Sequence, residues 1–182
     1  RENQRVLREL SARLRPFEPD LRSTLMALVD LDTLHVRARA ALAWRATPPG
    51  LADDAHSGLK IVDGRHPLLL EAGGDVVPFA LEMEAHERTL LISGPNTGGK
   101  SVLLKAIGLL TLLARSGVVP PVGKGTVLPG VSSVYADIGD QQSISESLST
   151  FSAHLATAMR ILEKADADSL ILMDELGTGT DP

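Results

Sequence analysis

The amino-acid sequence predicts an α/β protein whose sheet is preceded by a helical arm. Three observations lead to this prediction. Apolar residues recur at helical spacing over residues 1–46. From residue 59 onward, apolar runs of strand length alternate with helical stretches, which is the pattern of a sheet covered by helices. A glycine-rich loop ending in lysine and serine separates one such run from the helix that follows it.

Residues 1–50 form the first predicted unit, a helical lever or arm. The first helix covers residues 1–15, and its apolar residues share one face: Val6, Leu7, Leu10 and Leu14. Two prolines then break the helix, at positions 16 and 19. Asp20 is the predicted N-cap of a second helix that continues to Trp44. We expect the two helices to pack as an antiparallel arm.

Residues 51–182 form the second predicted unit. Strands are expected at residues 59–62, 76–77, 81–83, 89–93, 131–136 and 169–173. The continuous apolar runs at 89–93 and 169–173 predict strands buried on both faces. One helix is expected over residues 102–116, ending at Gly117. Another is expected over residues 151–164, and its apolar face consists of Leu155, Met159 and Leu162.

Composition and charge limit the classes of function. The 182-residue chain has no cysteine, which excludes disulfides and thiolate metal sites and fits a cytoplasmic location. No run of 18 apolar residues is present, so we expect no membrane span. Residues 1–46 hold nine Arg against six acidic residues, whereas the rest of the chain holds nine basic and seventeen acidic residues. DNA binding by this chain alone is therefore expected to be weak and sensitive to salt.

A loop at residues 94–101 matches the pattern G-x-x-x-x-G-K-[ST] at every fixed position. Glycines let such a loop curl so that backbone N–H groups face phosphate oxygens, and the following helix adds the positive end of its dipole. The lysine supplies a charge to the β and γ phosphates, and the serine supplies a hydroxyl ligand for Mg²⁺. The sequence therefore predicts a site for ATP or ADP with Mg²⁺, formed by Gly94, Pro95, Asn96, Thr97, Gly98, Gly99, Lys100 and Ser101.

A second acidic motif lies 74 residues after Lys100, where four apolar residues are followed by Asp174 and Glu175. A buried strand of this kind delivers carboxylates to the carboxyl edge of an α/β sheet, where ligands collect. Asp174 is the predicted Mg²⁺ ligand together with Ser101, through water because Mg²⁺ keeps much of its hydration shell. Glu175 is the predicted catalytic residue, which orients and deprotonates the attacking water.

These motifs resemble those of the MutS family, a branch of the ABC-type ATPases. The matching segments are its G-R-H-P turn, its Walker A loop, its S-T-F segment and its Walker B motif with D-loop, at residues 64–67, 94–101, 149–151 and 173–182. Thr97 and the stretch at residues 136–154 resemble the second bacterial branch, MutS type two. The motif-level resemblance covers residues 59–182.

The resemblance implies an ABC-type P-loop ATPase sheet, incomplete at its C-terminus, and a protein that works as a homodimer. Ser149 would meet the γ-phosphate bound by the other subunit. One of three Q-loop residues would contact Mg²⁺ or water, and the choice stays open among Asp140, Gln141 and Gln142. Upstream of the loop, the candidates for adenine contact are Val76, Val77 and Phe79. His66 and His154 are expected to have structural rather than ligand-binding roles.

The predicted function is an ATP-binding and hydrolysing module that couples closure of two subunits to action on DNA, in suppression of recombination. The alternative is a nucleotide-sensing clamp in which binding matters more than turnover, acting on stalled ribosomes in some lineages. A chromosome-maintenance ATPase is disfavoured because no long coiled coil separates the two motifs. A transporter ATPase is disfavoured because its S-G-G-Q segment is missing.

The sequence stops at Pro182, before the switch histidine and the dimer-holding helices that the family carries. The nuclease domain expected at the far end of this branch is also not in the sequence. We therefore expect a fragment that binds nucleotide but hydrolyses it very slowly by itself.

Overall fold

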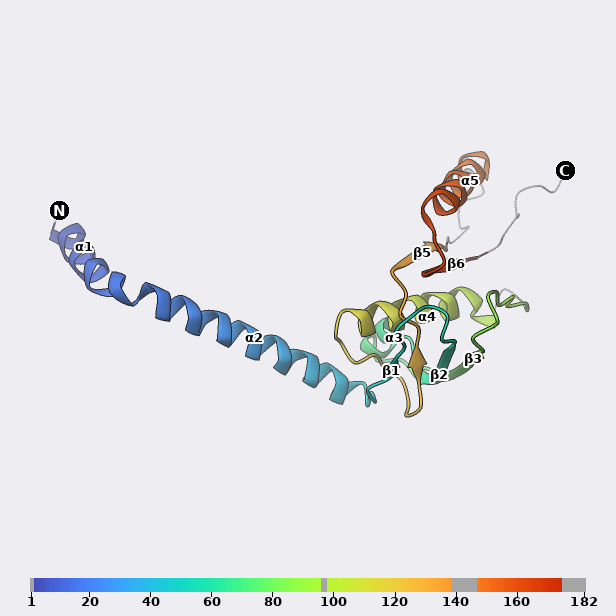
Figure 1. The fold of residues 1–182 in the computed structure, drawn as a ribbon, viewed down its shortest axis with the longest axis horizontal. Coiled ribbons are helices and arrows are strands. Elements are labelled where there is room, and N and C mark those ends of the chain that lie inside the picture. Colours follow the sequence, from blue (N-terminus) through green and yellow to red (C-terminus); the bar gives the residue numbers. More distant parts are fainter. Residues whose placement is uncertain (1, 96–97, 139–146, 175–182) are drawn as a thin grey trace. The chain divides into compact units, whose positions relative to one another are not determined.

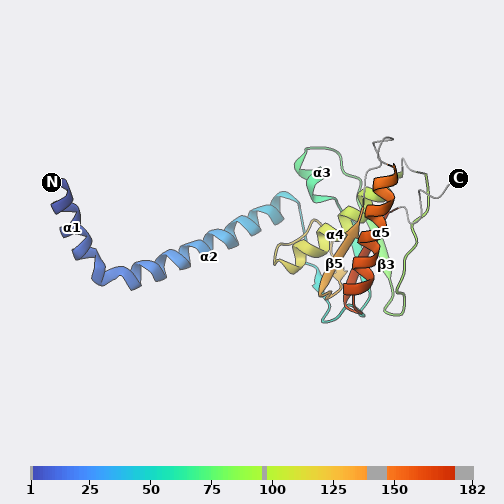
Figure 2. The ribbon, with the colours of Figure 1, turned by 90° about the horizontal axis from the view of Figure 1, so that it is seen from above.

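The computed structural model describes residues 2–95, 98–138 and 147–174, with the side chains of residues 147–153 excepted. The chain divides into two compact units, Arg1–Ala40 and Ala41–Pro182. Figures 1 and 2 show the elements of both. No helix in the described part of the chain combines the length and apolarity needed to cross a bilayer.

The first unit is helical and has no core of its own. Helix α1 covers Glu2–Leu14, the 3₁₀ turn η1 covers Arg15–Phe17, and helix α2 covers Glu18–Ala43. Both predicted helices are confirmed, but their antiparallel packing is wrong, since α1 leads end to end into α2 (Figure 1) and neither helix has a buried residue. Asp20 lies in the first turn of α2 rather than at its cap.

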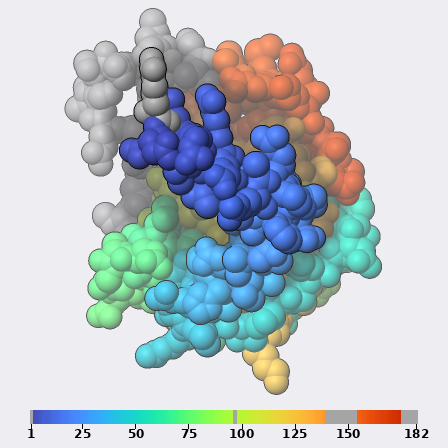
Figure 3. Space-filling model, turned by 90° about the vertical axis from the view of Figure 1, so that its left-hand side faces the viewer, coloured from blue at the N-terminus to red at the C-terminus, as the bar shows by residue number. Residues whose placement is uncertain are grey.

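The prolines explain why the chain bends at this junction instead of reversing. Pro16 and Pro19 both fall in the first turn of a helical segment. There the missing N–H forfeits no helical hydrogen bond, and the fixed φ suits a helix. The apolar side chains of the arm stay exposed, as Leu31 does at 63%, and they stand at the surface in Figure 3 (blue).

The described residues of the second unit form two small sheets. The first has the strand order β1-β4-β2-β3, in which β1 and β4 run parallel and the other pairs run antiparallel. Its strands are Gly50–Leu51 (β1), Leu59–Gly64 (β2), Phe79–Met83 (β3) and Val127–Leu128 (β4). The second sheet pairs β5 (Ser133–Asp137) in parallel with β6 (Ser169–Met173). Ser133 lies opposite Ser169 in this register, and Asp137 lies opposite Met173.

Helix α4, Lys100–Arg115, packs between these sheets and carries much of the core. Its residue Leu110 is fully buried with Ile61 of β2 and Leu128 of β4, and Leu172 of β6 joins the same cluster. Gly108 permits close approach to β6, because a Cβ at this position would lie 2.7 Å from a methyl carbon of Leu172. The core therefore fixes α4, and with it the loop at its start, against β6.

Two further helices lie among the described residues of this unit, together with two segments that lack regular structure. Helix α3 covers Pro67–Glu71, directly after the turn expected at residues 64–67, and was not predicted; helix α5 covers Ser147–Lys164. The strands expected at residues 76–77 and 89–93 are wrong, since neither segment has regular structure, and Leu91 is 87% exposed. An apolar run becomes a strand only when a neighbouring backbone completes its hydrogen bonds, and no described residue pairs with 89–93.

The inward face of α5 also differs from the predicted one. Leu155, Met159 and Leu162 are between 52% and 84% exposed, whereas Ile161 is 5% exposed. Strand β6 is likewise buried on one face only, since Leu172 is 5% and Ile171 is 43% exposed. Helical spacing identifies a shared face, but it does not say which of two apolar faces meets the sheet.

Candidate functional site

The glycine-rich loop turns sharply before α4. Gly99, the residue that caps α4, has a φ of 74°, in the left-handed region that favours glycine. Its carbonyl accepts the first helical hydrogen bond, from the Leu103 N–H at 2.9 Å. The Gly98 N–H donates to the Pro95 carbonyl at 2.9 Å and closes a turn within the loop. The predicted loop residues Asn96 and Thr97 lie outside the described residues.

Lys100 reaches back over the loop that precedes it. Its ammonium Nζ donates to the Gly94 carbonyl oxygen at 2.5 Å. This contact joins the last and the first part of the loop and holds a positive charge beside the loop backbone. An anion at this position would meet that charge and the N-terminal end of the α4 dipole together.

The two predicted metal ligands are brought together although they lie far apart in the sequence. The hydroxyl Oγ of Ser101 donates to the carboxylate Oδ2 of Asp174 in a short hydrogen bond. Ser101 stands in the first turn of α4, and Asp174 follows the last residue of β6. The contact joins the two sequence motifs at the carboxyl end of β6.

Two residues that the motif analysis did not select lie beside this pair. The Asp174 N–H donates to the Asp137 carbonyl at 2.9 Å, which extends the β5–β6 ladder by one bond. The Asp137 carboxylate in turn contacts Nδ1 of His154, at 2.9 and 3.0 Å to its two oxygens. A carboxylate at the end of a predicted parallel strand was the available signal for Asp137, because the carboxyl ends of such strands meet at one edge.

The expected structural role of His154 therefore takes a definite form. His154 is neither on the open surface nor simply packed, since its ring pairs with a carboxylate that is only 14% exposed. Its helix-mates on the inward face are Thr157, Ala158 and Ile161.

The oxygen donors at this edge suit Mg²⁺, which prefers carboxylate and hydroxyl oxygens and keeps several waters when it binds with a nucleotide. The direct contact between Ser101 and Asp174 places both oxygens at one point of this edge. No cluster of three or more metal-binding side chains occurs among the described residues. Two protein ligands with phosphate and water completing the shell is the arrangement expected of a nucleotide-bound Mg²⁺.

Other predicted residues lie apart from this edge or outside the description. Glu175, Asp140, Gln141 and Gln142 are not among the described residues, and the side chain of Ser149 is not described. Of the candidates for adenine contact, Val77 is 85% exposed, Val76 is half-buried, and Phe79 packs against the core cluster.

His66 is buried in the turn that precedes α3, and its Nδ1 has no hydrogen-bond partner among the described residues. Burial lowers the pKa of its ring below the ordinary value of 6.5, and the positive charge of Lys105 lowers the pKa further. The ring is therefore kept neutral beside α4, in agreement with a structural role.

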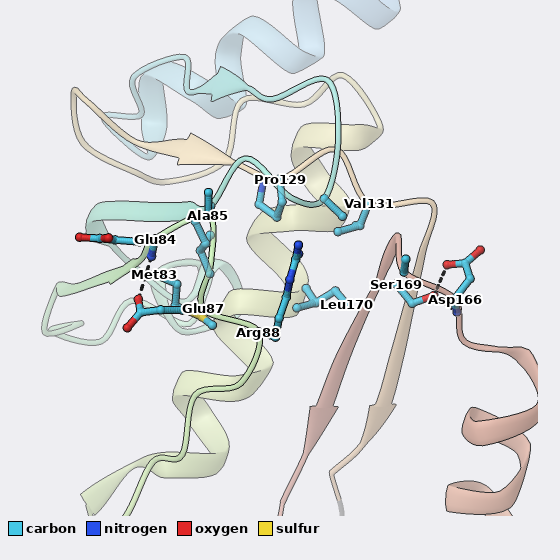
Figure 4. Close-up of a pocket in the computed structure, with 14 residues that line it drawn as sticks. Met83, Glu84, Ala85, Glu87, Arg88, Pro129, Val131, Asp166, Ser169 and Leu170 are labelled. Atoms are coloured by element: carbon cyan, nitrogen blue, oxygen red, sulfur yellow. Dashed lines mark hydrogen bonds between the residues drawn. The ribbon is translucent and has the colours of Figure 1, made fainter.

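A separate pocket of about 270 Å³ opens at the other end of β6 (Figure 4). Its wall includes Met83, Arg88, Val131, Asp166 and Leu170. It adjoins Ser169, the first residue of β6, whereas Asp174 follows the last, so the two places are about 15 Å apart along the strand. This pocket is not the loop edge at which the motif residues meet.

The sequence comparisons identify the family of the chain. A protein-family model described as MutS domain V matches residues 90–182, which include the loop, β5, α5 and the Ser101–Asp174 pair. The chain belongs to the MutS family. MutS domain V is the ATPase domain of this family.

Relatives named Endonuclease MutS2 match the whole chain. The protein of Gemmatimonas aurantiaca is 53% identical over 182 residues, and that of Pelotomaculum thermopropionicum is 48% identical over 182 residues. The protein of Halalkalibacterium halodurans is 46% identical over 182 residues. The chain spans 22–23% of the length of these relatives. The similarity supports the second bacterial branch over the mismatch-repair branch.

Proposed function

We propose that this chain is the ATP-binding and hydrolysing module of a MutS-like homodimer, built on an ABC-type P-loop sheet. The observation that carries the proposal is the hydrogen bond between Ser101 and Asp174. It unites a complete phosphate-loop motif with an acidic strand end, which are the two parts that such ATPases use to hold a nucleotide with its metal.

Each residue at this edge has a defined part in the proposal. Lys100 would move its ammonium from the Gly94 carbonyl to the β and γ phosphates, and the loop N–H groups would donate hydrogen bonds to the phosphate oxygens. Ser101 and Asp174 hold Mg²⁺, which when bound neutralises charge that develops on the phosphates. Glu175, directly after Asp174, orients the attacking water and takes its proton.

In the dimer, Ser149 at the start of α5 offers N–H groups to the γ-phosphate bound by the other subunit. Closure of two such modules on nucleotide moves the helical arm, and the larger protein acts on branched or non-specific DNA in suppression of recombination. We assign the contact with DNA to the larger protein and not to this module. Residues 47–182 carry nine basic against seventeen acidic residues, a balance that does not attract the phosphates of DNA.

The test is titration of the chain with a fluorescent ATP analogue, with Mg²⁺ and with chelator. Lys100→Ala should weaken binding about tenfold to a hundredfold, because a charge-assisted contact to phosphate is lost. Lys124→Ala removes an exposed lysine from another turn and serves as the matched control. Equal affinities for the wild type and Lys100→Ala would refute nucleotide binding at this loop.

A second pair of variants tests the metal assignment. Asp174→Asn should lower the affinity about tenfold in Mg²⁺ and leave it unchanged in chelator, because only the metal-bound complex uses the carboxylate. Asp168→Asn makes the same change of charge just before β6 and should have no effect in either condition. In the homodimeric protein, turnover that is absent while Mg²⁺-dependent binding persists would favour the nucleotide-sensing clamp over the hydrolysing module.

A further inference from the structure

Two residues of β5 hold helix α5 at two points along its length. The Tyr135 hydroxyl donates to the Lys164 carbonyl at 3.2 Å, at the last residue of the helix. The Asp137 carboxylate holds His154 Nδ1 at 2.9 Å, ten residues earlier. Tyr135 and Asp137 are two residues apart, so they point to the same face of the strand. Ten helical residues span about 15 Å, so the two bonds fix the direction of α5 and not only its position.

The remaining contacts of α5 come from a narrow face. Ile161 lies on the inward face and is buried. Leu155, Met159 and Leu162 lie on the outer face and are more than half exposed. Over residues 154–164, where the side chains are described, the helix therefore depends on its polar bonds for orientation. The Asp137 carboxylate is 14% exposed, so water competes little with His154 for it.

The same residue also touches the nucleotide edge. The Asp137 carbonyl accepts the hydrogen bond of the Asp174 N–H, and the Asp174 carboxylate accepts that of the Ser101 hydroxyl. Asp137 therefore binds α5 through its side chain and the end of β6 through its backbone. His154 lies five residues after Ser149, about 7.5 Å along the helix axis. Its bond is consequently the described contact nearest to the segment that the proposed dimer offers to a phosphate.

We propose that Asp137 and His154 are positioning residues of the ATPase site, whose bond orients α5 relative to the edge formed by Ser101 and Asp174. The inference rests on the proposed function. His154 acts as a hydrogen-bond donor through Nδ1 and transfers no proton in the reaction.

Four variants separate this role from the others. His154→Leu and Asp137→Ala each remove one partner, and the double variant removes both. His154→Asn keeps a side-chain N–H donor close to the place of Nδ1 but does not titrate. Arg160→Gln changes an exposed residue of the same helix and is the control.

The first measurement is hydrogen–deuterium exchange of the α5 amides at residues 154–164. Exchange should be about tenfold faster in His154→Leu and in Asp137→Ala, no faster in the double variant than in either single variant, and restored in His154→Asn. Arg160→Gln should exchange as the wild type does. Unchanged exchange in both single variants, or additive effects in the double variant, would overturn the proposal.

The second measurement is nucleotide affinity and single-turnover hydrolysis by the same variants. His154→Leu should bind the fluorescent nucleotide within about twofold of the wild type yet hydrolyse about tenfold more slowly, because positioning acts on the reaction and not on the loop. His154→Asn should restore the rate with an unchanged pH profile. A rate that stays low in His154→Asn, or a pH profile that loses a limb, would identify His154 as a proton carrier and contradict the positioning role. Failure of the wild type to bind nucleotide would refute the proposed function, while the exchange cycle still decides whether the pair orients α5.

Discussion

The two ends of strand β6 carry similar groups in different settings. At each end an aspartate accepts a hydrogen bond from a serine hydroxyl. At the carboxyl end the donor to Asp174 is Ser101, which lies 73 residues away on another element. At the amino end the donor to Asp166 is Ser169, three residues away, with 2.7 Å between Oγ and Oδ1 (Figure 4).

The difference shows how a functional edge is recognised. The Asp166–Ser169 bond closes a short turn between α5 and β6, as aspartate and serine side chains do wherever a chain reverses. The Ser101–Asp174 bond exists only because α4 is packed against β6 through Gly108 and Leu172. The fold as a whole therefore brings two oxygen ligands together at the carboxyl end, while the Asp166–Ser169 bond at the amino end follows from local sequence.

The largest expected effect is on catalysis at the carboxyl end. Glu175→Gln should slow single-turnover ATP hydrolysis about 10²- to 10⁴-fold, because the amide cannot take the proton of the attacking water. Nucleotide affinity should stay within about twofold. Asp168→Asn removes an acidic charge just before β6 and should hydrolyse at the rate of the wild type. A similar loss of rate in both variants would show that charge, and not the position of the carboxylate, matters.

The sequence predicted the motif residues of the carboxyl end because each motif has a fixed spacing and a strand or helix of the right length beside it. The helix predicted over residues 102–116 and the strand predicted over residues 169–173 are confirmed, as Lys100–Arg115 and Ser169–Met173. The contact between Ser101 and Asp174 followed from the expectation that both motifs meet at one sheet edge.

The rest was not predictable from local patterns. The Asp137–His154 bond joins β5 to α5, and no spacing rule connects a strand end with a helix that starts ten residues later. The segment at residues 89–93 has the composition of a buried strand, but composition does not supply a pairing partner. The buried face of α5 could not be chosen from the sequence, because apolar residues recur at helical spacing on two faces. Leu155 and Met159 lie on one face, and Ile161 lies on the other.

The second expected effect concerns stability, and it tests whether β6 joins the two ends into one element. Leu172→Ala should lower the free energy of unfolding by about 2–5 kcal/mol, because Leu172 is 5% exposed and packs in the core beside Gly108. Ile171 lies on the other face and is 43% exposed, so Ile171→Ala should lower the free energy of unfolding by about 1 kcal/mol or less. Urea denaturation of the two variants measures the difference. Equal losses of stability would mean that β6 is buried on both faces and would contradict its one-sided burial.

The smallest expected effect lies at the amino end and depends on pH. The Ser169 hydroxyl, followed by the Asp168 N–H and the Ser132 hydroxyl, lowers the pKa of the Asp166 carboxyl below its ordinary value of 3.8. The folded protein therefore binds fewer protons on this group than the unfolded chain does between the two pKa values, and stability rises with pH in that interval. The contribution of Asp166 is complete above the ordinary pKa and disappears as the pH falls through the lowered one. Because the carboxyl is fully exposed, solvent keeps the effect small.

Asp166→Asn should accordingly melt slightly below the wild type at pH 6, and the difference in Tm should shrink as the pH is lowered below 3.8. Asp168→Asn makes the same change of charge in the same turn. If it reproduced both the lower Tm and its pH dependence, the effect would come from net charge, and the turn would not depend on the Asp166–Ser169 bond.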